Sequence, residues 1–400
     1  MSTTKSNVPE VRFKGFSGAW KESALQSIAE VLDGDRGHNY PNGNDLQATG
    51  HTLFLNASNV TANGFKLDVV QYINEEKSNR MGNGKLDLDD IILTSRGSVG
   101  HIAWYNEHIK QQAPFARINS GMLILRSKKH VTPSFVAQFL KSPAGKKKID
   151  LISFGSAQPQ LTKNSVSTYI VTLPTSKSEQ MRIGNYFQQL DSLITLHRQK
   201  YDKLLNIKKA MLEKMYPKKG ADVPEIRFKG FSEKWEERTL GDMAKITTGS
   251  SNREDSGLDG QYTFFDRSED IRTSDIYLFD CEAIIVAGEG SDFIPKYFIG
   301  KFDLHQRTYA IMDLDDADTK FLFYYIHLFR KYFLNQAVGS TVKSLRLPMF
   351  QEMPIKYPKK SEQIKIGTYF KKLDTLLTLH QSQLEKLKNI KKACLEKMFV

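Results

Sequence analysis

Two stretches of the chain repeat the same long pattern of apolar and polar positions. Residues 178–216 read SEQMRIGNYFQQLDSLITLHRQKYDKLLNIKKAMLEKMY, and residues 361–399 read SEQIKIGTYFKKLDTLLTLHQSQLEKLKNIKKACLEKMF. Well over half of the aligned positions are identical, and neither copy contains proline. Apolar side chains recur at alternating steps of four and three, which predicts two long helices, each with a coiled-coil seam.

Each of these helices would span roughly 58 Å at 1.5 Å per residue. A single helix has no way to bury its own seam, so we expect the two copies to bury each other's. One seam position is lysine in both copies, Lys208 and Lys391, with Ile207 and Ile390 beside them to supply local apolar contact. His197 and His380 also occupy equivalent seam positions, which favours a packing role over catalysis.

A shorter repeat precedes each helix. VPEVRFKGFSGAW at residues 8–20 returns as VPEIRFKGFSEKW at residues 223–235; we call these the leading motifs. The aromatic trio of the first copy, Phe13, Phe16 and Trp20, predicts a structural anchor that packs locally at the start of a domain. The order is therefore leading motif, variable region, long helix, all of it twice. Pro217 ends the first helix, and residues 218–222 form a polar linker into the second half.

The two variable regions, about residues 32–172 and 247–356, have the same order of predicted strands, loops and helix but different sequences. In the first, we expect strands at Ile91–Thr94 and 121–127, a helix that starts after Thr132 and Pro133, and a loop at 155–161. In the second, residues 281–292 parallel the first strand and its glycine loop. Residues 318–334 are the matching helix, and 339–345 occupy the place of the loop. These are two versions of one domain with different loops.

Composition limits the class of protein. The 400 residues, 40% hydrophobic and 26% charged, suit two globular domains rather than one core. A net charge of +12 with pI about 9.3 leaves two interpretations open, a lysine-rich surface or a polyanion partner. The chain has no apolar run of membrane-spanning length and no signal peptide at its start, so we expect a cytoplasmic protein. Cys281 and Cys394 are expected to be buried thiols rather than a disulfide or a metal site.

The sequence offers no constellation for catalysis. It lacks the phosphate-loop pattern, the third glycine of a dinucleotide loop at Gly288–Gly290, the HExxH motif and paired-cysteine zinc spacing. It also lacks the Asn-Pro-Pro-aromatic motif of amino-directed DNA methyltransferases. Asp191 and Asp374 repeat within the helices, which favours a role in the helical frame. We therefore predict that the chain is not an enzyme and uses no cofactor or metal.

The duplicated SEQ-x-x-IG-x-YF…NIKKA-x-LEKM helices, the VPE-x-RFKGF motifs and the GS-x-x-x-x-L loops together resemble the specificity subunit of a type I restriction–modification enzyme. The resemblance covers essentially the whole chain. It implies an α+β fold in which a pair of long antiparallel coiled-coil helices separates two α/β target recognition domains, with pseudo-two-fold internal symmetry. The expected boundaries are 8–177 and 223–360 for the recognition domains, 178–216 and 361–399 for the helices, and 217–222 for the linker.

The resemblance also implies partners: double-stranded DNA, two methyltransferase subunits and two restriction–translocase subunits, with the chemistry carried by those subunits. The two unlike domains would read an asymmetric bipartite target across a gap of at most about 17 base pairs. Lysines shared by both helices, Lys203/Lys386 and Lys209/Lys392, either dock the two identical partners or form a solvated face. A coiled-coil adaptor that binds two proteins without DNA is the alternative function.

Base reading needs side chains with paired donors or acceptors on loops at the edges of the domains. Each candidate can also be a solvated loop residue, so the prediction concerns the set. In the first domain the candidates are Asn56, Ser58, Asn59, Ser95, Arg96, Gln158, Gln160 and Lys163; in the second they are Arg267, Ser268, Glu289, Ser291, Lys343, Ser344 and Arg346.

Overall fold

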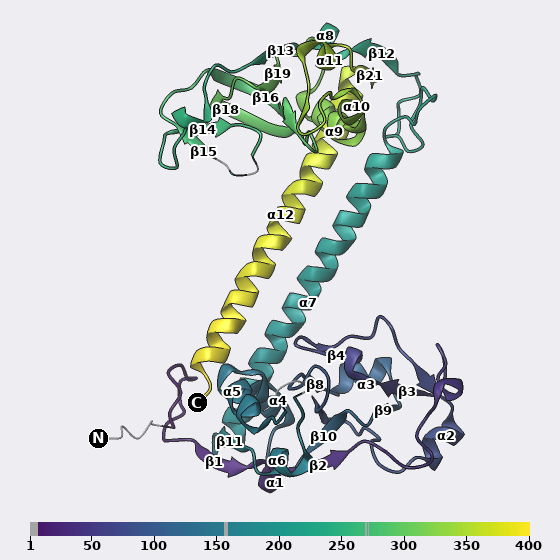
Figure 1. Cartoon of the computed structure of the whole chain (residues 1–400), viewed down its shortest axis with the longest axis vertical. Helices are drawn as coiled ribbons and strands as arrows, with labels where there is room; N and C mark the ends of the chain where they lie inside the picture. Colours follow the sequence, from purple (N-terminus) through teal and green to yellow (C-terminus); the bar gives the residue numbers. More distant parts are fainter. Residues whose placement is uncertain (1–6, 156–158, 269, 271) are drawn as a thin grey trace. The chain divides into compact units, whose positions relative to one another are not determined.

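The computed structural model of the chain describes residues 7–155, 159–268, 270 and 272–400. The chain forms two units: unit 1 comprises residues 1–196 and 383–400, and unit 2 comprises residues 197–382. The two predicted long helices are present as α7 (Lys177–Lys214) and α12 (Lys360–Lys397), each continuous over 38 residues. Both helices contribute to both units (Figure 1), so each unit contains one segment of α7 and one of α12.

Unit 1 contains a four-stranded antiparallel sheet and a smaller three-stranded sheet. The larger sheet has the order β2 (Ala29–Asp33), β10 (Met122–Ser127), β7 (Ile91–Thr94), β8 (Ile102–Trp104). The smaller has the order β6 (Tyr72–Ile73), β3 (Thr52–Leu55), β9 (Ala116–Ile118). Strands β3 and β9 are parallel, whereas β3 and β6 are antiparallel. The strands predicted at Ile91–Thr94 and 121–127 are thereby confirmed.

Unit 2 repeats this order in one six-stranded sheet. Its strands are β13 (Lys245–Thr248), β19 (Thr308–Met312), β16 (Phe279–Ala287), β18 (Lys296–Leu304), β14 (Tyr262–Phe265) and β15 (Arg272–Ser274). Again one pair, β14 and β18, is parallel and the other pairs are antiparallel. Strand β18 pairs with both β16 and β14, so it corresponds to β8 and β9 of unit 1 together. In unit 1 helix α3 (Glu107–Gln112) separates those two strands. The internal repeat therefore extends to strand order and direction.

Short elements complete each unit. The two-stranded ladders are β1 (Lys21–Ala24) with β11 (Ile170–Leu173), β4 (Val60–Thr61) with β5 (Gly64–Phe65), β12 (Glu236–Thr239) with β21 (Pro354–Tyr357), and β17 (Glu289–Gly290) with β20 (Lys343–Ser344). The short helices are α1 (Leu25–Ile28), α2 (Glu75–Arg80), α6 (Lys163–Ser167), α8 (Leu240–Met243) and α11 (Leu347–Gln351), with 3₁₀ turns η1 (Gly43–Asp45), η2 (Ala57–Asn59) and η3 (Arg253–Asp255).

The helix predicted after Thr132 and Pro133 is in fact two helices, α4 (Pro133–Lys141) and α5 (Pro143–Ile152). The break at Ser142 has a local cause, because a residue before proline is disfavoured in the helical region. Ser142 also caps α5, since its hydroxyl accepts a hydrogen bond from the backbone of Gly145 at 3.1 Å. The matching segment of unit 2 is likewise divided, into α9 (Thr319–Phe329) and α10 (Lys331–Gln336).

The main core of each unit lies between the sheet, the first of these helices and the long helices. In unit 1, Phe135 and Phe139 of α4 pack with Leu125 of β10 and with Phe187 of α7. In unit 2, Phe321 of α9 packs with Ile311 of β19 and Phe370 of α12. The seam residues near the start of each long helix are thus buried as predicted, and burial of such side chains is the main source of helix stability.

The leading motifs anchor each unit, as predicted. Trp20 is buried against Phe135, with ring centroids 5.5 Å apart, and Phe13 packs edge-on against Tyr186. An ion pair that the sequence analysis did not anticipate adds to this contact. The Arg12 guanidinium donates to both oxygens of Glu179 at 2.7 and 2.8 Å, and Arg227 donates to Glu362 at 2.7 Å twice. The repeated arginine of the leading motif therefore binds the repeated glutamate of the SEQ tripeptide.

The glutamine of the same tripeptide joins the long helix to the start of α4 in unit 1 and of α9 in unit 2. Gln180 accepts a hydrogen bond from the backbone N–H of Thr132 at 2.9 Å and donates to the carbonyl of Pro174 at 2.8 Å. Gln363 does the same with Asp318 and Pro358, at 2.9 and 2.8 Å. Since both tripeptides have the same partners, their repetition reflects a structural joint.

Within each unit the segments of α7 and α12 run antiparallel, and the seam lysines find partners. In unit 1, Lys391 pairs with Asp191 at 2.5 Å; in unit 2, Lys208 pairs with Asp374 at 2.5 Å. The lysine in each seam is thus neutralised by the repeated aspartate of the other helix, and the predicted frame role of these aspartates is confirmed. His197 and His380 contact each other through their Nδ1 atoms at 3.0 Å in unit 2.

Candidate nucleic-acid interface

In both units the same backbone hydrogen bonds bring the predicted recognition loops together. After β7, the N–H of Ser95 donates to the carbonyl of Gly121 at 2.8 Å, and the N–H of Leu161 donates to the carbonyl of Ser95 at 2.9 Å. In unit 2, Gly288 donates to Arg307 at 2.8 Å and Leu345 donates to Gly288 at 2.7 Å. The glycine-bounded loop and the GS-x-x-x-x-L loop therefore adjoin at the same place in each sheet.

A third loop in each unit forms an identical turn at the end of the parallel strand. The Asn56 side chain accepts hydrogen bonds from the backbone and hydroxyl of Ser58, at 2.9 and 2.6 Å. In unit 2, Asp266 accepts from the backbone of Ser268 at 2.8 Å and also from its hydroxyl. Side chains of this kind fix turns by bonding to the backbone two residues on. The correspondence places Ala57 of unit 1 where Arg267 stands in unit 2.

Most of the predicted residues of unit 1 are accessible, but two are not. Ser58, Arg96 and Lys163 are exposed, and Asn56 and Gln160 are half-buried. Asn59 and Ser95 are each only 1% exposed. Gln158 lies outside the described residues.

Asn59 is held inside its loop, where its amide nitrogen donates to the carbonyls of Lys66 and Val69 at 3.2 and 2.8 Å. Contact of Asn59 or Ser95 with a base would require the side chain to leave a closed interior. We therefore assign both a role in holding the loops, and the proposal below leaves them out.

Two of the predicted residues of unit 2, Arg267 and Ser344, lie beside the carboxylate of a third, Glu289. Arg267, Ser291, Lys343 and Arg346 are exposed, whereas Ser268, Glu289 and Ser344 are half-buried. Glu289 and Ser344 face each other across the β17–β20 ladder. The sequence analysis missed Arg307, whose Nη1 donates to Glu289 at 2.6 Å. No local motif marks Arg307, because its position depends on the turn between β18 and β19 lying beside β17.

The charged groups near this carboxylate influence one another. Burial alone would raise the pKa of Asp266, but hydrogen bonds from Ser268 and the charge of Arg253 outweigh it and lower that pKa. Burial lowers the pKa of His305, and nearby Arg307 acts in the same direction. Asp266 therefore stays ionised at neutral pH and His305 stays neutral. The charge that these loops present to solvent is carried mainly by arginine and lysine.

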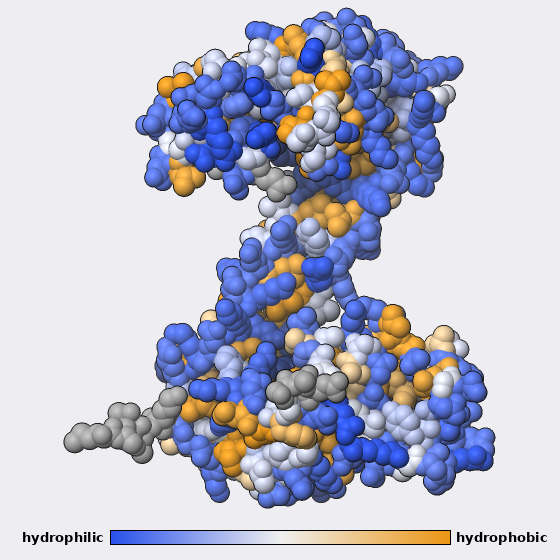
Figure 2. All heavy atoms as spheres, viewed as in Figure 1, coloured by the Kyte–Doolittle hydropathy of each residue, from blue (hydrophilic) through white to orange (hydrophobic). Residues whose placement is uncertain are grey.

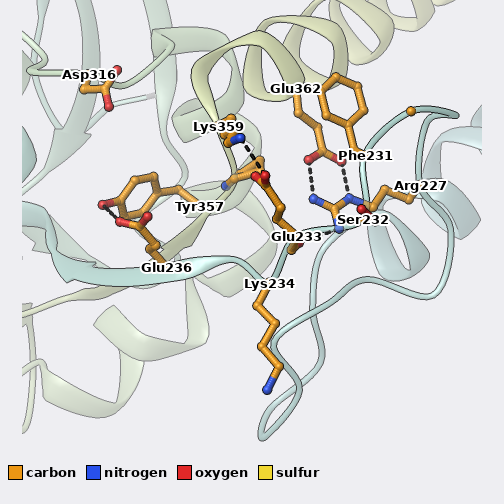
Figure 3. Close-up of a pocket in the computed structure, with 12 residues that line it drawn as sticks. Arg227, Phe231, Ser232, Glu233, Lys234, Glu236, Asp316, Tyr357, Lys359 and Glu362 are labelled. Atoms are coloured by element: carbon orange, nitrogen blue, oxygen red, sulfur yellow. Dashed lines mark hydrogen bonds and ion pairs between the residues drawn. The ribbon is translucent and has the colours of Figure 1, made fainter.

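A pocket of about 260 Å³ lies elsewhere in unit 2, between its leading motif and the start of α12. Figure 3 shows Arg227 beside Glu362 and Lys359 beside Glu233, and the latter pair is 2.6 Å apart. These charges neutralise each other in pairs, and none of the predicted base-reading residues lines the pocket. We interpret it as a crevice of the anchor rather than a ligand site.

The described residues offer neither a metal site nor a membrane-spanning helix. Over the described residues, no three His, Cys, Asp or Glu side chains gather in a way that would hold a metal ion. None of the helices in this part of the chain is both long enough and apolar enough to cross a bilayer. Figure 2 shows hydrophilic residues over most of the visible surface of each unit.

Comparison with known proteins assigns the family. The model of the "Type I restriction modification DNA specificity domain" matches residues 18–206 and 232–389, which is most of the chain. The chain belongs to this family. Each matched segment lies within one of the two repeats, and the predicted resemblance to a type I specificity subunit is confirmed. The family supplies DNA specificity, which agrees with the prediction that the chain is not an enzyme.

Two relatives of this specificity family add detail. The chain is 34% identical over 156 residues to the type I restriction enzyme EcoDI specificity subunit of Escherichia coli. That alignment covers 39% of this chain and spans only 34% of the length of the curated relative. The crystal structure of the type I restriction–modification S subunit from M. genitalium covers 98% of this chain and 99% of its own, with a TM-score of 0.65 at 15% identity. The predicted α+β specificity-subunit fold is thereby confirmed.

Proposed function

We propose that this chain selects the DNA target of a type I restriction–modification complex and has no chemical activity of its own. The observation that carries the proposal is that one loop scaffold is built twice with different side chains. Ser95 and Gly288 make the equivalent loop hydrogen bonds, and the next residue is Arg96 in unit 1 but Glu289 in unit 2. Arginine suits guanine, and a carboxylate at the same position has no donor to offer that base, so the two loops differ in what they can read. Two unlike readers imply an asymmetric, bipartite target.

The partners that we propose are double-stranded DNA, two methyltransferase subunits and two restriction–translocase subunits. Family membership supports assembly of this kind, and the paired repeats suit two copies of one partner. Lys203, Lys209, Lys386 and Lys392 are exposed at equivalent places on α7 and α12, so they are candidates for docking. Charge reversal at both copies followed by co-purification tests this role, and native mass spectrometry of the intact complex gives the stoichiometry.

The central test is sequence recognition by the complex with its methyltransferase subunits. We expect methylome sequencing of a host carrying the complex to give a split motif with unlike halves. Arg96→Ala should reduce discrimination at the half-site of unit 1 by roughly 1–3 kcal/mol, or about 10- to 100-fold, and leave the other half-site unchanged. Equal weakening at both half-sites would reassign Arg96 to assembly. Absence of salt-dependent DNA affinity in the full complex would favour the adaptor alternative.

A further inference from the structure

A triad of charged side chains in unit 2 has no chemical counterpart in unit 1. Glu289 accepts a hydrogen bond from Arg307 at 2.6 Å on one oxygen, and its other oxygen lies 3.6 Å from Nη1 of Arg267. The carboxylate is only 18% exposed, whereas Arg267 and Arg307 are 61% and 63% exposed. The triad thus has a sheltered acceptor at its centre and two guanidinium groups that reach into solvent.

The backbone shows which residues of unit 1 occupy these positions. Arg307 accepts the loop hydrogen bond from Gly288 just as Gly121 accepts it from Ser95. Glu289 therefore corresponds to Arg96, Arg307 to Gly121 and, through the shared turn, Arg267 to Ala57. One scaffold carries arginine, glycine and alanine in unit 1 but glutamate, arginine and arginine in unit 2. Unit 1 presents one cation here and unit 2 presents two cations around one anion.

The triad has little to contribute to folding. Ion pairs that involve highly exposed arginines add almost nothing to stability, because solvent screens them and side-chain entropy opposes them. The pairing does restrict the rotamers of two long side chains. Each guanidinium has five N–H donors in a fixed fork, and Arg307 uses one of them on Glu289. Most donors of both groups are left for an outside acceptor, and the arginines are held before it arrives.

We propose that Arg267 and Arg307 read guanines in the half-site bound by unit 2, and that Glu289 is the positioning residue that orients them. The proposal rests on the proposed function, that this chain binds duplex DNA. Guanine offers O6 and N7 in the major groove to the two-pronged donor of arginine. The sheltered carboxylate sets the spacing between the two forks, so it selects where the guanines lie. At the corresponding three positions unit 1 has a single arginine, Arg96.

The experiment uses the full complex with methyltransferase subunits and a duplex that contains both half-sites. Arg307→Ala and Arg267→Ala should each lower discrimination at the half-site of unit 2 by about 10- to 100-fold. Replacing the cognate guanine by 7-deazaguanine, which lacks N7, should weaken binding of the wild-type complex but add little further loss in the matching arginine variant. The half-site of unit 1 serves as the internal control and should be read normally.

Glu289→Gln tests positioning, because glutamine keeps the shape of the side chain but removes its charge. We expect this variant to retain affinity for non-specific DNA and to lose discrimination only at the unit 2 half-site. Glu289→Asp should recover less than the full discrimination, since the shorter side chain moves the acceptor away from both arginines. Unchanged base preference in Glu289→Gln would overturn the positioning role.

Three further outcomes separate the hypotheses. Suppose that the arginine variants weaken binding equally on all sequences and that each lowers the slope of log K against log salt concentration by about 1. The arginines then contact phosphate and the guanine assignment is wrong. If discrimination is untouched in both arginine variants while the wild-type complex reads both half-sites, this inference fails and the proposed function stands. If the wild-type complex has no affinity for DNA, the proposed function itself fails.

Discussion

The two units differ most sharply at one buried strand position. Arg117 of β9 lies opposite Phe54 and Asp303 of β18 lies opposite Phe264, so the two residues correspond. Arg117 donates to the carbonyls of Met81, Gly82 and Asn83, whereas Asp303 accepts from the hydroxyl of Ser251 at 2.7 Å and from a backbone N–H. The same place in the sheet therefore holds a buried arginine in one unit and a buried aspartate in the other.

This contrast indicates what the fold constrains. Strand order, direction and the loop hydrogen bonds are the same in both units, so the backbone frame does not depend on the charge at its centre. The partners of each side chain come from the segments around it: Arg117 donates to three loop carbonyls, whereas Asp303 accepts through Oδ1 while its Oδ2 is buried without a partner among the described residues. In contrast, the joints at the start of each long helix use the same residue types in both units: an arginine of the leading motif binds the glutamate, and the glutamine bonds to backbone groups. The two units therefore share the residues that join them to the long helices and differ in the residues of the recognition loops.

The largest loss of stability should come from breaking the buried arginine–glutamate pair that both units share. Glu179→Gln and Glu362→Gln each leave an arginine of the leading motif without its bidentate partner. Removing one member of a buried pair costs about 3–5 kcal/mol of unfolding free energy. Urea denaturation should show a similar loss for both variants, in unit 1 for Glu179→Gln and in unit 2 for Glu362→Gln. A loss in only one of them would break the equivalence of the two anchors.

The second prediction concerns Gly184 and Gly367, which are repeated within the long helices. Alanine is normally preferred to glycine inside a helix by about 1 kcal/mol. Here an added Cβ would lie 2.1 Å from the hydroxyl oxygen of Ser134 in unit 1, and 2.7 Å from the backbone nitrogen of Phe321 in unit 2. Both Gly→Ala variants should therefore destabilise their unit, by about 1–3 kcal/mol.

The neighbour of each glycine sharpens this comparison. In unit 1, Ser134→Ala removes the closest oxygen and should recover part of the stability that Gly184→Ala loses. In unit 2 the obstacle includes backbone, which no substitution removes, so we expect no equivalent rescue of Gly367→Ala. The difference is measured as a coupling energy in a double-mutant cycle by thermal or urea unfolding. Additive effects in the unit 1 cycle would show that Ser134 is not the obstacle.

The sequence predicted the long helices well but predicted the arrangement of the candidate base-reading residues poorly. The spacing of apolar residues predicted α7 and α12 to within two residues of each end, because a long periodic pattern averages over local exceptions. It did not reveal that Lys208 and Lys391 pair with the repeated aspartates. Those contacts depend on how the two helices align with each other, and the sequence of one helix alone does not determine that alignment. Asn56 and Asn59 look alike in the sequence, yet the 3₁₀ turn leaves the first half-buried and fully buries the second. Arg307 was missed because its place depends on contacts between distant loops.

The smallest expected effect exploits a difference in titratable residues. Lys141 follows Gln138 by three residues on α4, and His327 follows Tyr324 by three on α9; Gln138 and Tyr324 donate to Asp191 and Asp374. Lys141 and His327 therefore occupy the same place. Burial lowers the pKa of Lys141 to about 8, with Asp191 opposing this and Lys391 adding to it. Burial also lowers the pKa of His327, assisted by Lys208 and Arg330 and opposed by Asp374.

The sign of the effect is the same for both groups, but the pH range is different. The unfolded chain takes up the proton of Lys141 near its ordinary pKa of 10.5, before the folded chain does. Unit 1 should therefore lose stability as the pH falls from about 10.5 to 8 and stay level below that. The His327 contribution to unit 2 should be complete above about 6.5 and decline as the pH falls further.

Lys141→Met should remove the alkaline dependence and stabilise unit 1 at pH 7 by about 1–2 kcal/mol, a value reduced for the partial solvent contact of the side chain. His327→Gln should remove the acidic dependence of unit 2. The three tryptophans allow each unit to be followed alone: Trp235→Phe leaves fluorescence only in unit 1, and Trp20→Phe with Trp104→Phe leaves it only in unit 2. A pH profile of unit 1 that does not respond to Lys141→Met would place the charge of Lys141 in solvent rather than in the frame.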